Sequence, residues 1–260
     1  MKYLNDISKD CVGKVCKSLN SGDFKILKYN GSKSVEKQFL KTWFETTAQL
    51  GDIKSGRVKD PYAPSVYSIG IVGTKYPSKV NGRNTKEYDL WYSMLRRCYS
   101  DNFKKKNPTY EGCEVSDNFK SYEYFYEWCH KQIGFGGDGS GNPFQIDKDL
   151  LIKGNKVYSE NTCIFIPSEI NLVLIKCTAS RGEYLIGVCW NKTKKSFVAH
   201  VGKSKGKQEH LGYFKTEIEA FNAYKVAKES FIKELANKWK SQIDERAYEA
   251  LMKYTVEITD

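Results

Sequence analysis

Asp147 and Asn171 are the residues whose types and places in the chain could do chemistry. Residues 144–152 are predicted as a strand that carries Asp147, and Pro167 and Ser168 are predicted to open a helix that carries Asn171. A carboxylate on a strand and an amide on the first turn of the following helix can converge on one divalent ion, because both offer hard oxygen ligands. The pair therefore predicts a metal site.

The elements that must position this pair form a strand, strand, helix unit. A turn through residues 153–155 separates the first strand from a second strand at residues 162–166. Asp149 lies two residues after Asp147 on the same predicted strand face, as a spare carboxylate that could bind the metal or take up a proton. The alternative interpretation is that residues 147–149 are a solvated strand end and that Asn171 caps a helix or packs.

The order Asp147, Asn161, Asn171 resembles the Asp-His, Asn, Asn order of HNH endonucleases, the ββα-metal nucleases common among phage homing enzymes. The resemblance implies that Asp147 and Asn171 bind Mg²⁺ or Mn²⁺ and that Asn161 orients the neighbouring catalytic group. Lys148 stands where that family has its histidine. The patterns W-x-x-M-x-x-R-C-Y, T-Y-x-x-C, F-x-x-W-C and I-D-K-D, which precede and include this stretch, also resemble phage-encoded proteins of this kind.

The general base is the open part of this site. Lys148 is a poor base at neutral pH unless burial or neighbouring cations lower its pKa by several units. Asp149 is a second candidate, and His130, near the end of the preceding predicted helix, is a third. The sequence therefore supports a metal site better than it supports a complete catalytic site.

Composition points to a polyanion as the partner. The chain has 260 residues, a formal net charge of +11, and 18 Tyr, 13 Phe and 5 Trp. Basic, aromatic chains of this kind most simply bind nucleic acid. Neither a signal peptide nor a membrane-spanning run is evident, so a cytoplasmic protein is expected. The eight cysteines include no C-x-x-C pair, so reduced, mostly buried thiols are expected rather than structural zinc.

The first half of the chain is predicted to contain a small β-rich module and two helices. Residues 11–72 are mostly strand, with a two-residue hairpin turn at Asn30-Gly31. Residues 61–82 are rich in Pro, Gly, Ser and Tyr and mark a linker. Amphipathic helices are predicted at residues 86–99 and at residues 116–134, where Ser116 is the N-cap candidate. The predicted buried faces are Tyr88, Trp91, Leu95 and Cys98 in the first helix, and Phe119, Tyr122, Tyr126, Cys129 and Ile133 in the second.

Three strands and a long helix are predicted near the C-terminus. The strands lie at residues 184–190, 196–202 and 209–214, each bounded by turn residues. Thr216 and Glu219 form a capping box, which predicts that a helix begins there. From Ile186 to Lys215 there are seven lysines and one carboxylate, Glu209. This balance places a positive edge on the predicted sheet, where DNA phosphates could release their counterions.

This C-terminal region resembles the Apetala/ethylene-response-factor type of DNA-binding domain, on the residues GV at 187–188, Trp190, FVA at 197–199, HLG at 210–212, Phe214 and the helix from residue 220 to 227. The resemblance implies that a sheet lies in the major groove of DNA and that its outward side chains contact bases and phosphates. The expected DNA-binding residues are Trp190, Lys192, Lys194, Lys195, His200, Lys203, Lys205, Lys207 and His210.

Together these observations predict a multidomain α+β protein with a β-rich module at residues 1–75, an HNH-like ββα-metal domain at 76–180 and a sheet-plus-helix domain at 181–260. The expected function is a Mg²⁺- or Mn²⁺-dependent DNA endonuclease that acts on double-stranded DNA as a monomer or weak dimer, without a small-molecule cofactor. One metal site cuts one strand, so a monomer would nick. The alternatives are a DNA-binding protein that keeps the nuclease fold without its chemistry, and an RNA-binding protein, which only charge and aromatic content favour.

Overall fold

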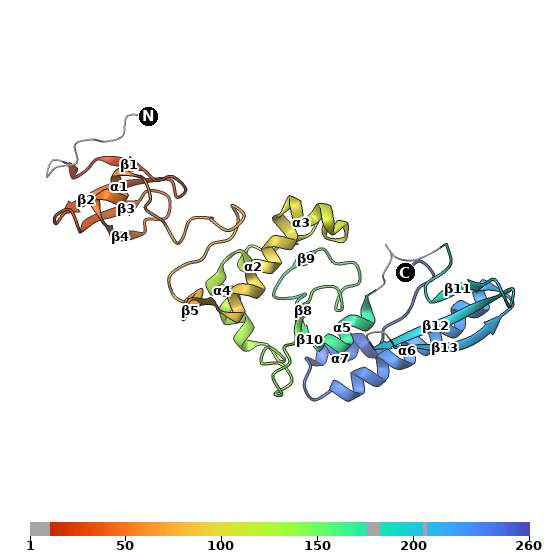
Figure 1. The fold of residues 1–260 in the computed structure, drawn as a ribbon. Coiled ribbons are helices and arrows are strands. Elements are labelled where there is room, and N and C mark those ends of the chain that lie inside the picture. Colours follow the sequence, from red (N-terminus) through yellow and green to blue (C-terminus); the bar gives the residue numbers. More distant parts are fainter. Residues whose placement is uncertain (1–10, 176–182, 205–206) are drawn as a thin grey trace. The chain divides into compact units, whose positions relative to one another are not determined.

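The computed structural model describes residues 11–175, 183–204 and 207–260, and the chain is a mixed α+β protein with several small sheets (Figure 1). The chain divides into two compact units, Met1–Trp128 and Cys129–Asp260. Among the described helices, none is both long enough and apolar enough to cross a membrane.

The first unit begins with a four-stranded antiparallel sheet in which each strand pairs with the next along the chain. Its strands are β1 Val15–Lys17, β2 Asp23–Tyr29, β3 Val35–Phe39 and β4 Glu45–Ala48, and helix α1, Leu50–Lys54, follows. Alternate residues of β2 and β3 enter one apolar core with Ile53 and Val58. The prediction that this region is β-rich is confirmed.

The predicted two-residue turn at Asn30-Gly31 is wrong. Strands β2 and β3 do form a hairpin, but Tyr29 pairs with Val35, so the connection spans residues 30–34. Only Gly31 of the two predicted turn residues has a positive φ, at 113°. The strand register explains the longer connection. Val35 lies in the core and pairs with Tyr29, so residues 30–34 are all left to the turn.

The first predicted helix is confirmed as α2, Lys86–Tyr99, and Thr85 caps its start by accepting a hydrogen bond from the N–H of Tyr88. Its buried side chains include Trp91, Leu95 and Cys98, as expected, together with Met94. The other elements of this unit are β5 Lys79–Val80, β6 Arg83–Asn84, α3 Asp101–Lys106, the 3₁₀ turns Pro108–Tyr110 and Asn118–Lys120, and β7 Glu114–Val115.

The second predicted helix is shorter than expected, since α4 covers only Tyr122–Lys131. Ser116 accepts a hydrogen bond from the N–H of Phe119, so it opens the preceding 3₁₀ turn instead of the helix. The break between the two elements changes which residues face inward. Phe125 and Trp128 are buried, whereas Ile133 lies beyond the helix and is 54% exposed.

The second unit contains the strand, strand, helix order that the sequence predicts, with shorter strands. Strand β8 covers Gln145–Asp147 and pairs antiparallel with β10, Ile164–Ile166. Strand β9, Val157–Tyr158, lies between them in sequence, and helix α5, Ser168–Leu174, follows β10 directly. The predicted strand at residues 144–152 is therefore wrong beyond Asp147, where a side-chain-capped turn ends it.

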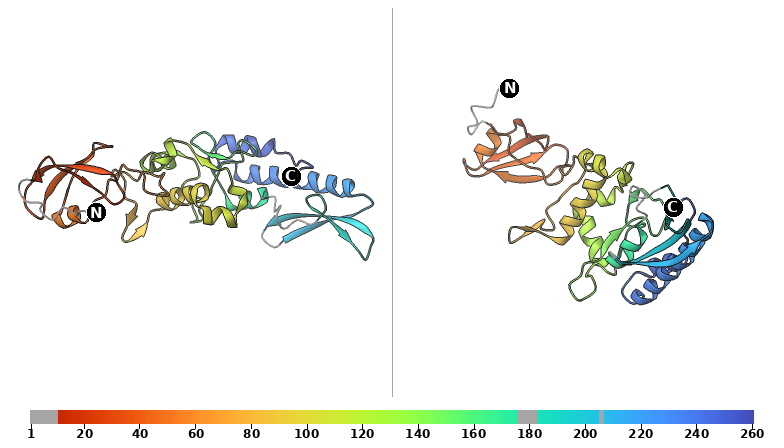
Figure 2. Two further views of the ribbon diagram at one scale, coloured as in Figure 1. Left: turned by 90° about the horizontal axis from the view of Figure 1, so that it is seen from above. Right: turned by 45° about the vertical axis from the view of Figure 1, so that its right-hand side comes forward.

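A three-stranded antiparallel sheet and a long helix complete the second unit, and Figure 2 shows the helix lying across one face of the sheet. The elements are β11 Val188–Asn191, β12 Ser196–Ser204, β13 Lys207–Phe214, α6 Glu217–Trp239 and α7 Glu245–Met252. The capping box is present, with both Thr216 and Glu219 hydrogen-bonded as expected.

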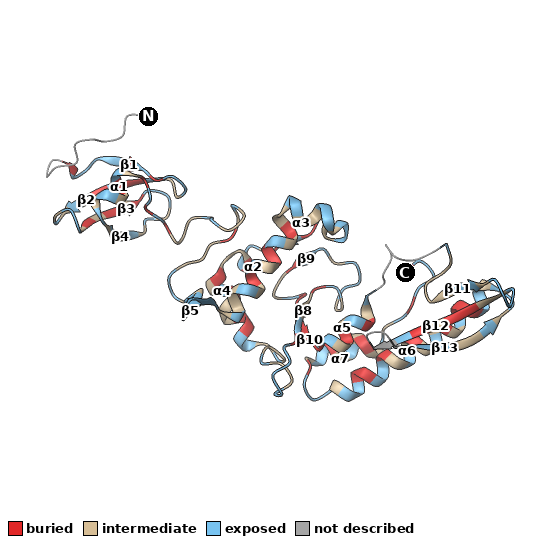
Figure 3. Cartoon of the chain, in the orientation of Figure 1, coloured by how far each residue is buried: buried red, intermediate tan, exposed pale blue. Residues whose placement is uncertain are grey.

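One side of this sheet is the core of the C-terminal region. Ala199 and Val201 of β12 pack against Ala220, Phe221 and Tyr224 of α6, and β12 is accordingly the most buried strand of this sheet (Figure 3). The residues of β12 that alternate with them lie on the opposite face, where Val198 is also buried, at 2% exposure. The sheet therefore packs on α6 with one face, and side chains of its other face include both the buried Val198 and the exposed Tyr213.

Candidate metal site and nucleic-acid interface

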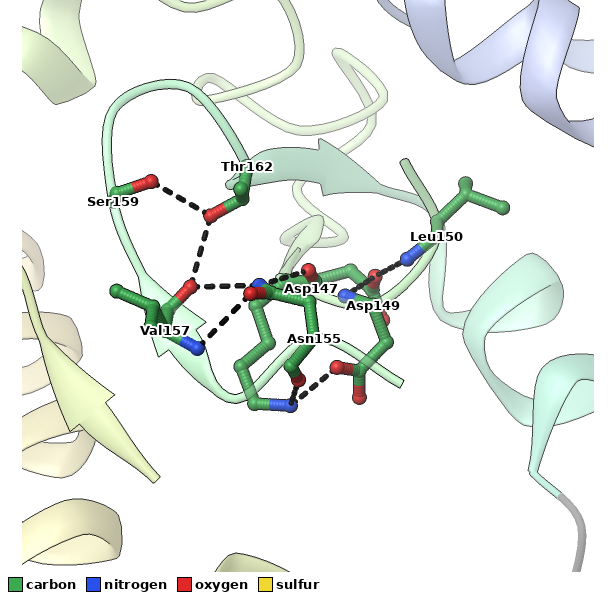
Figure 4. Close-up of polar contacts among 8 residues, drawn as sticks. Asp147, Asp149, Leu150, Asn155, Val157, Ser159 and Thr162 are labelled. Atoms are coloured by element: carbon green, nitrogen blue, oxygen red, sulfur yellow. Dashed lines mark hydrogen bonds and ion pairs between the residues drawn. The ribbon is translucent and has the colours of Figure 1, made fainter. Parts of the chain in front are cut away.

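The candidate metal site is built at the point where β8 ends. The carboxylate Oδ1 of Asp147 accepts hydrogen bonds from the backbone N–H groups of Asp149, at 2.8 Å, and Leu150, at 2.7 Å (Figure 4). These bonds turn the chain away from β10 and fix the orientation of the carboxylate. Among the described residues, none donates a hydrogen bond to the other oxygen, Oδ2.

Burial dominates the electrostatics of this carboxyl group. Removal from water raises the pKa of Asp147 above its ordinary value, and the charge of Asp149 acts in the same direction. The two backbone donors and the charge of Lys148 oppose that rise. A divalent cation beside Asp147 would favour the ionised form, so metal binding would release a proton from any fraction that is protonated.

Asn171 reaches this site from helix α5. Its Nδ2 donates a hydrogen bond to Oε1 of Gln145. Gln145 precedes Asp147 by two residues in β8, so both side chains lie on one face of the strand. With this amide orientation, Oδ1 of Asn171 accepts no hydrogen bond from the described residues. The structure therefore links Asn171 to the residue two positions before Asp147, and among the described residues no contact joins Asn171 to Asp147 directly.

The oxygen atoms of Asp147 and Asn171 are of the kind that a hard cation prefers. No group of three or more His, Cys, Asp or Glu side chains that could hold a metal occurs in the part of the chain that the structure describes. Mg²⁺ commonly takes one or two carboxylates and completes its shell with water and substrate phosphate. Asp147 and Asn171 could supply protein ligands of that kind, whereas Oε1 of Gln145 already accepts the hydrogen bond from Asn171. Gln145 is absent from the sequence prediction, although its position two residues before Asp147 was a usable signal.

Lys148 is placed very differently from Asp147. It is 6% exposed, and its ammonium donates hydrogen bonds to the carboxylate of Asp149 and, at 2.8 Å, to the backbone carbonyl of Asn155. It also lies 5.6 Å from the ring centroid of Tyr158. These contacts close the loop that leads from β8 to β9. They give Lys148 a role in holding this loop closed.

The side chain of Asn155 completes this closure. Its Nδ2 donates to the carbonyl of Lys148 at 2.8 Å and to that of Val157 at 2.7 Å, and its Oδ1 accepts from the N–H of Val157 at 3.1 Å (Figure 4). The amide thus replaces backbone pairing across the loop. Asn155 was missed as a site residue because its partners lie seven positions back and two positions forward, a spacing that no periodic pattern signals.

The other predicted catalytic residues are not brought to Asp147 by any observed contact. Asn161 is exposed in the turn before β10, and within the described residues it forms no hydrogen bond with Lys148. His130 lies in α4 with its ring edge against Phe135, at a centroid separation of 5.0 Å. Asp149 remains the carboxylate beside the site, and its side chain is 53% exposed.

Replacing Lys148 by Met separates a structural role from a catalytic one. Loss of the buried ammonium leaves the Asn155 carbonyl and the Asp149 carboxylate without their donor, so the free energy of unfolding should fall by about 2 kcal/mol. Denaturant unfolding measures this change, with Lys131→Met, an exposed lysine of α4, as the control. A Lys148→Met protein of unchanged stability would contradict the structural role.

The face of the C-terminal sheet that α6 leaves open carries polar and aromatic side chains. We call it the outer face and define it by Cys189, Val198, His200, His210 and Tyr213, which alternate with the core residues of the three strands. Rings gather on it: His200 and His210 lie 5.3 Å apart, and His210 and Tyr213 lie 4.8 Å apart, between centroids. Burial and the nearby His210 lower the pKa of His200.

Positive charge predominates on this side of the sheet. Lys192, Lys194 and Lys195 are exposed in the turn between β11 and β12, and the ammonium of Lys194 lies 4.2 Å from the ring centroid of Tyr213. Glu209 pairs with the core residue Val201 and so belongs to the helix side of the sheet. The outer face, as defined, therefore has lysines beside it and no carboxylate within it.

Trp190 does not belong to the outer face. It pairs with Phe197, whose side chain packs toward α6, and the two rings meet edge to face at 4.8 Å. Trp190 is nevertheless 37% exposed at the rim of the sheet. The side chains of Lys203, Lys205 and Lys207, also predicted to bind DNA, lie outside the described residues.

Helix α5 and the residue before β8 contact the end of helix α6 within the second unit. Oε2 of Glu169, in α5, accepts hydrogen bonds from Lys238 at 2.5 Å and from the indole of Trp239 at 3.0 Å, at the end of α6. Phe144, just before β8, packs edge to face on Trp239 with a centroid separation of 5.6 Å. The helix that carries Asn171 is therefore tied to the helix that supports the sheet.

Comparisons with protein-family models, with curated proteins and with solved structures found no match to this chain.

Proposed function

We propose that this chain is a metal-dependent DNA endonuclease of the ββα type, which docks on duplex DNA through the outer face of its C-terminal sheet. The observation that carries the proposal is the hydrogen bond from Asn171 of α5 to Gln145 of β8, two residues before Asp147, while Asp147 and Asn171 each keep an oxygen that no described residue uses. Hard oxygen ligands beside a basic sheet suit a cation that is shared between protein and phosphate.

The residues of the chain have separate roles in this proposal. Asp147 binds the cation, and the N–H groups of Asp149 and Leu150 hold its carboxylate in one orientation. Asn171 adds an amide oxygen, and Gln145 positions that amide. When bound, the cation stabilises negative charge on the attacked phosphate and lowers the pKa of a coordinated water. Asp149, exposed at the same turn, can take up the proton that the water releases.

Docking on DNA would come from the lysine-rich turn and the outer face. Lys192, Lys194 and Lys195 are exposed on one turn and can each approach a phosphate. His210 and Tyr213 offer ring faces and hydrogen-bonding groups beside them. Lysine contacts to phosphate supply affinity with little base preference, so the sequence preference of this protein should be modest relative to its affinity.

A second candidate function is DNA binding without cleavage, and the environment of Lys148 favours it. The residue at the position of the usual catalytic histidine is buried and fully engaged in closing a loop. A unit of this kind could persist as a folded scaffold that positions the sheet. Affinity for duplex DNA is common to both functions, whereas a requirement for a divalent cation belongs only to the enzyme.

Supercoiled plasmid separates the two functions. Incubation with the purified chain and Mg²⁺ or Mn²⁺ should convert it to the open circular form, because one metal site cuts one strand. Addition of a chelator should stop the conversion, and a mobility-shift assay in the same chelator should still show bound duplex. Plasmid that is retarded but uncut at every metal concentration would exclude the endonuclease function and support DNA binding without cleavage.

A further inference from the structure

An open pocket lies in the N-terminal β-sheet module, apart from the metal site and the C-terminal sheet. Its volume is about 570 Å³, within the usual range for small-molecule sites. Strand β4, the segment after α1 and the turn before β3 contribute its walls. Its lining includes Lys33, Lys37, Phe44, Thr46, Arg57 and Lys59.

Lys37 is the unusual residue of this pocket. It lies in β3 between Val35 and Phe39, on the strand face that forms the core, and only 1% of its surface is exposed. Its ammonium lies 4.9 Å from the ring centroid of Phe39. Among the described residues it has no hydrogen-bond acceptor and no carboxylate within salt-bridge distance, although Asp60 is close enough to act on its charge.

An isolated buried ammonium is costly, so its presence requires a reason. Lysine is almost never fully buried unless it is paired. Burial lowers the pKa of Lys37 to about 8, and the charge of Asp60 only partly opposes this. Asp60 is itself occupied, since it accepts hydrogen bonds from Thr42 at 2.5 Å and from the N–H of Tyr62 at 2.9 Å. An anion in the pocket would supply the missing partner.

The remaining lining is suited to a phosphate ester. Lys33, Arg57 and Lys59 are exposed cations around the pocket, and Thr46 adds a hydroxyl donor. The acidic residue of the lining, Asp52, already faces Arg57 at 3.8 Å. Phe44 supplies an apolar wall. Cations and hydroxyl donors bind phosphate oxygens, while an aromatic wall suits the sugar or base of a nucleotide.

We propose that this pocket binds the phosphate group of a nucleotide, with Lys37 as the buried cation that contacts it. The nucleotide can be free or part of a nucleic-acid strand, because both present the same phosphate and sugar. This site is independent of the proposed endonuclease site, since no residue is shared between them.

Calorimetric titration of the full chain with adenosine monophosphate tests the site, and Lys37→Met is the decisive variant. Met has a similar length and no charge, so it removes the anion contact and the cost of burying an ammonium together. The variant should unfold at the same temperature as the parent chain or higher, yet bind the nucleotide at least about tenfold more weakly, the effect of one charged contact. Lys25→Gln, an exposed lysine of β2 outside the pocket, is the matched control.

Two further measurements secure the interpretation. Lys33→Gln with Lys59→Gln changes only exposed residues, so it tests the pocket even if Lys37→Met does not fold, and it too should weaken binding. Adenosine, which lacks phosphate, should not bind. If Lys37→Met weakens binding of a single-stranded oligonucleotide as much as binding of adenosine monophosphate, the site is assigned to a strand, and an oligonucleotide affinity that the variant leaves unchanged assigns the site to the free nucleotide. Equal affinity of parent and both variants, or binding of adenosine alone, overturns the proposal.

Discussion

Asp147→Asn is expected to reduce metal-dependent nicking of supercoiled plasmid by about 100-fold or more, because the site loses its charged ligand and several kcal/mol of transition-state stabilisation with it. The substitution keeps the size of the side chain. The amide oxygen of Asn can still accept the N–H groups of Asp149 and Leu150, so the turn after β8 should survive. The affinity for duplex DNA should therefore change little, and the two measurements together locate the defect in chemistry.

The chain contains a matched control for this substitution. Asp138, in the loop before β8, is another carboxylate whose Oδ1 accepts backbone N–H groups, from Ser140 at 2.8 Å and Asn142 at 3.1 Å. Asp138→Asn makes the same chemical change in the same kind of turn, and it should nick plasmid at the parental rate. Parental activity in Asp147→Asn would remove Asp147 from the metal site and with it the observation on which the endonuclease proposal rests.

Replacing Lys192, Lys194 and Lys195 together by Gln is expected to lower duplex affinity roughly 10- to 100-fold in about 50 mM salt, because up to three phosphate contacts disappear. The slope of log affinity against log salt should become shallower by up to about 2.7, at roughly 0.9 for each lost contact. Fluorescence anisotropy with a labelled duplex over a series of salt concentrations measures both quantities.

Lys104, Lys105 and Lys106 provide the control for that experiment. They end helix α3 in the first unit and carry the same total charge. Their replacement by Gln should affect affinity only through net charge, a weak effect that salt screens. If the two triple variants lost the same affinity with the same change in slope, the turn between β11 and β12 would have no special part in binding.

The sequence predicted those elements whose signals are local. Helix α2 begins where Thr85 caps it, and α6 begins at the capping box of Thr216 and Glu219. Each start depends on residues three positions apart, which a sequence displays directly. Residues of β12 alternate between the two faces of the C-terminal sheet, and each strand pairs with the next along the chain, so their order and pairing could also be inferred.

The sequence did not predict features that depend on distant partners. Nothing in residues 144–152 shows that Asp147 would bond to the chain ahead and end its strand, or that Lys148 would reach the carbonyl of Asn155. Gln145 acquires its place only through Asn171, 26 positions later. The burial of Lys37 is similarly invisible, because a lysine in an alternating strand is normally assigned to the solvent face.

The contacts of Glu169 with Lys238 and Trp239 hold helix α5 against the end of helix α6. They join α5, which belongs to the proposed cutting site, to α6, which packs on the sheet proposed to bind DNA. Phe144, just before β8, also packs on Trp239 of α6. An enzyme built in this way would cut DNA at a constant distance from the position that its C-terminal sheet binds. The breaks on a denaturing gel should then lie at a fixed distance from the DNA positions that the bound chain protects, and Glu169→Ala should widen the spread of that distance.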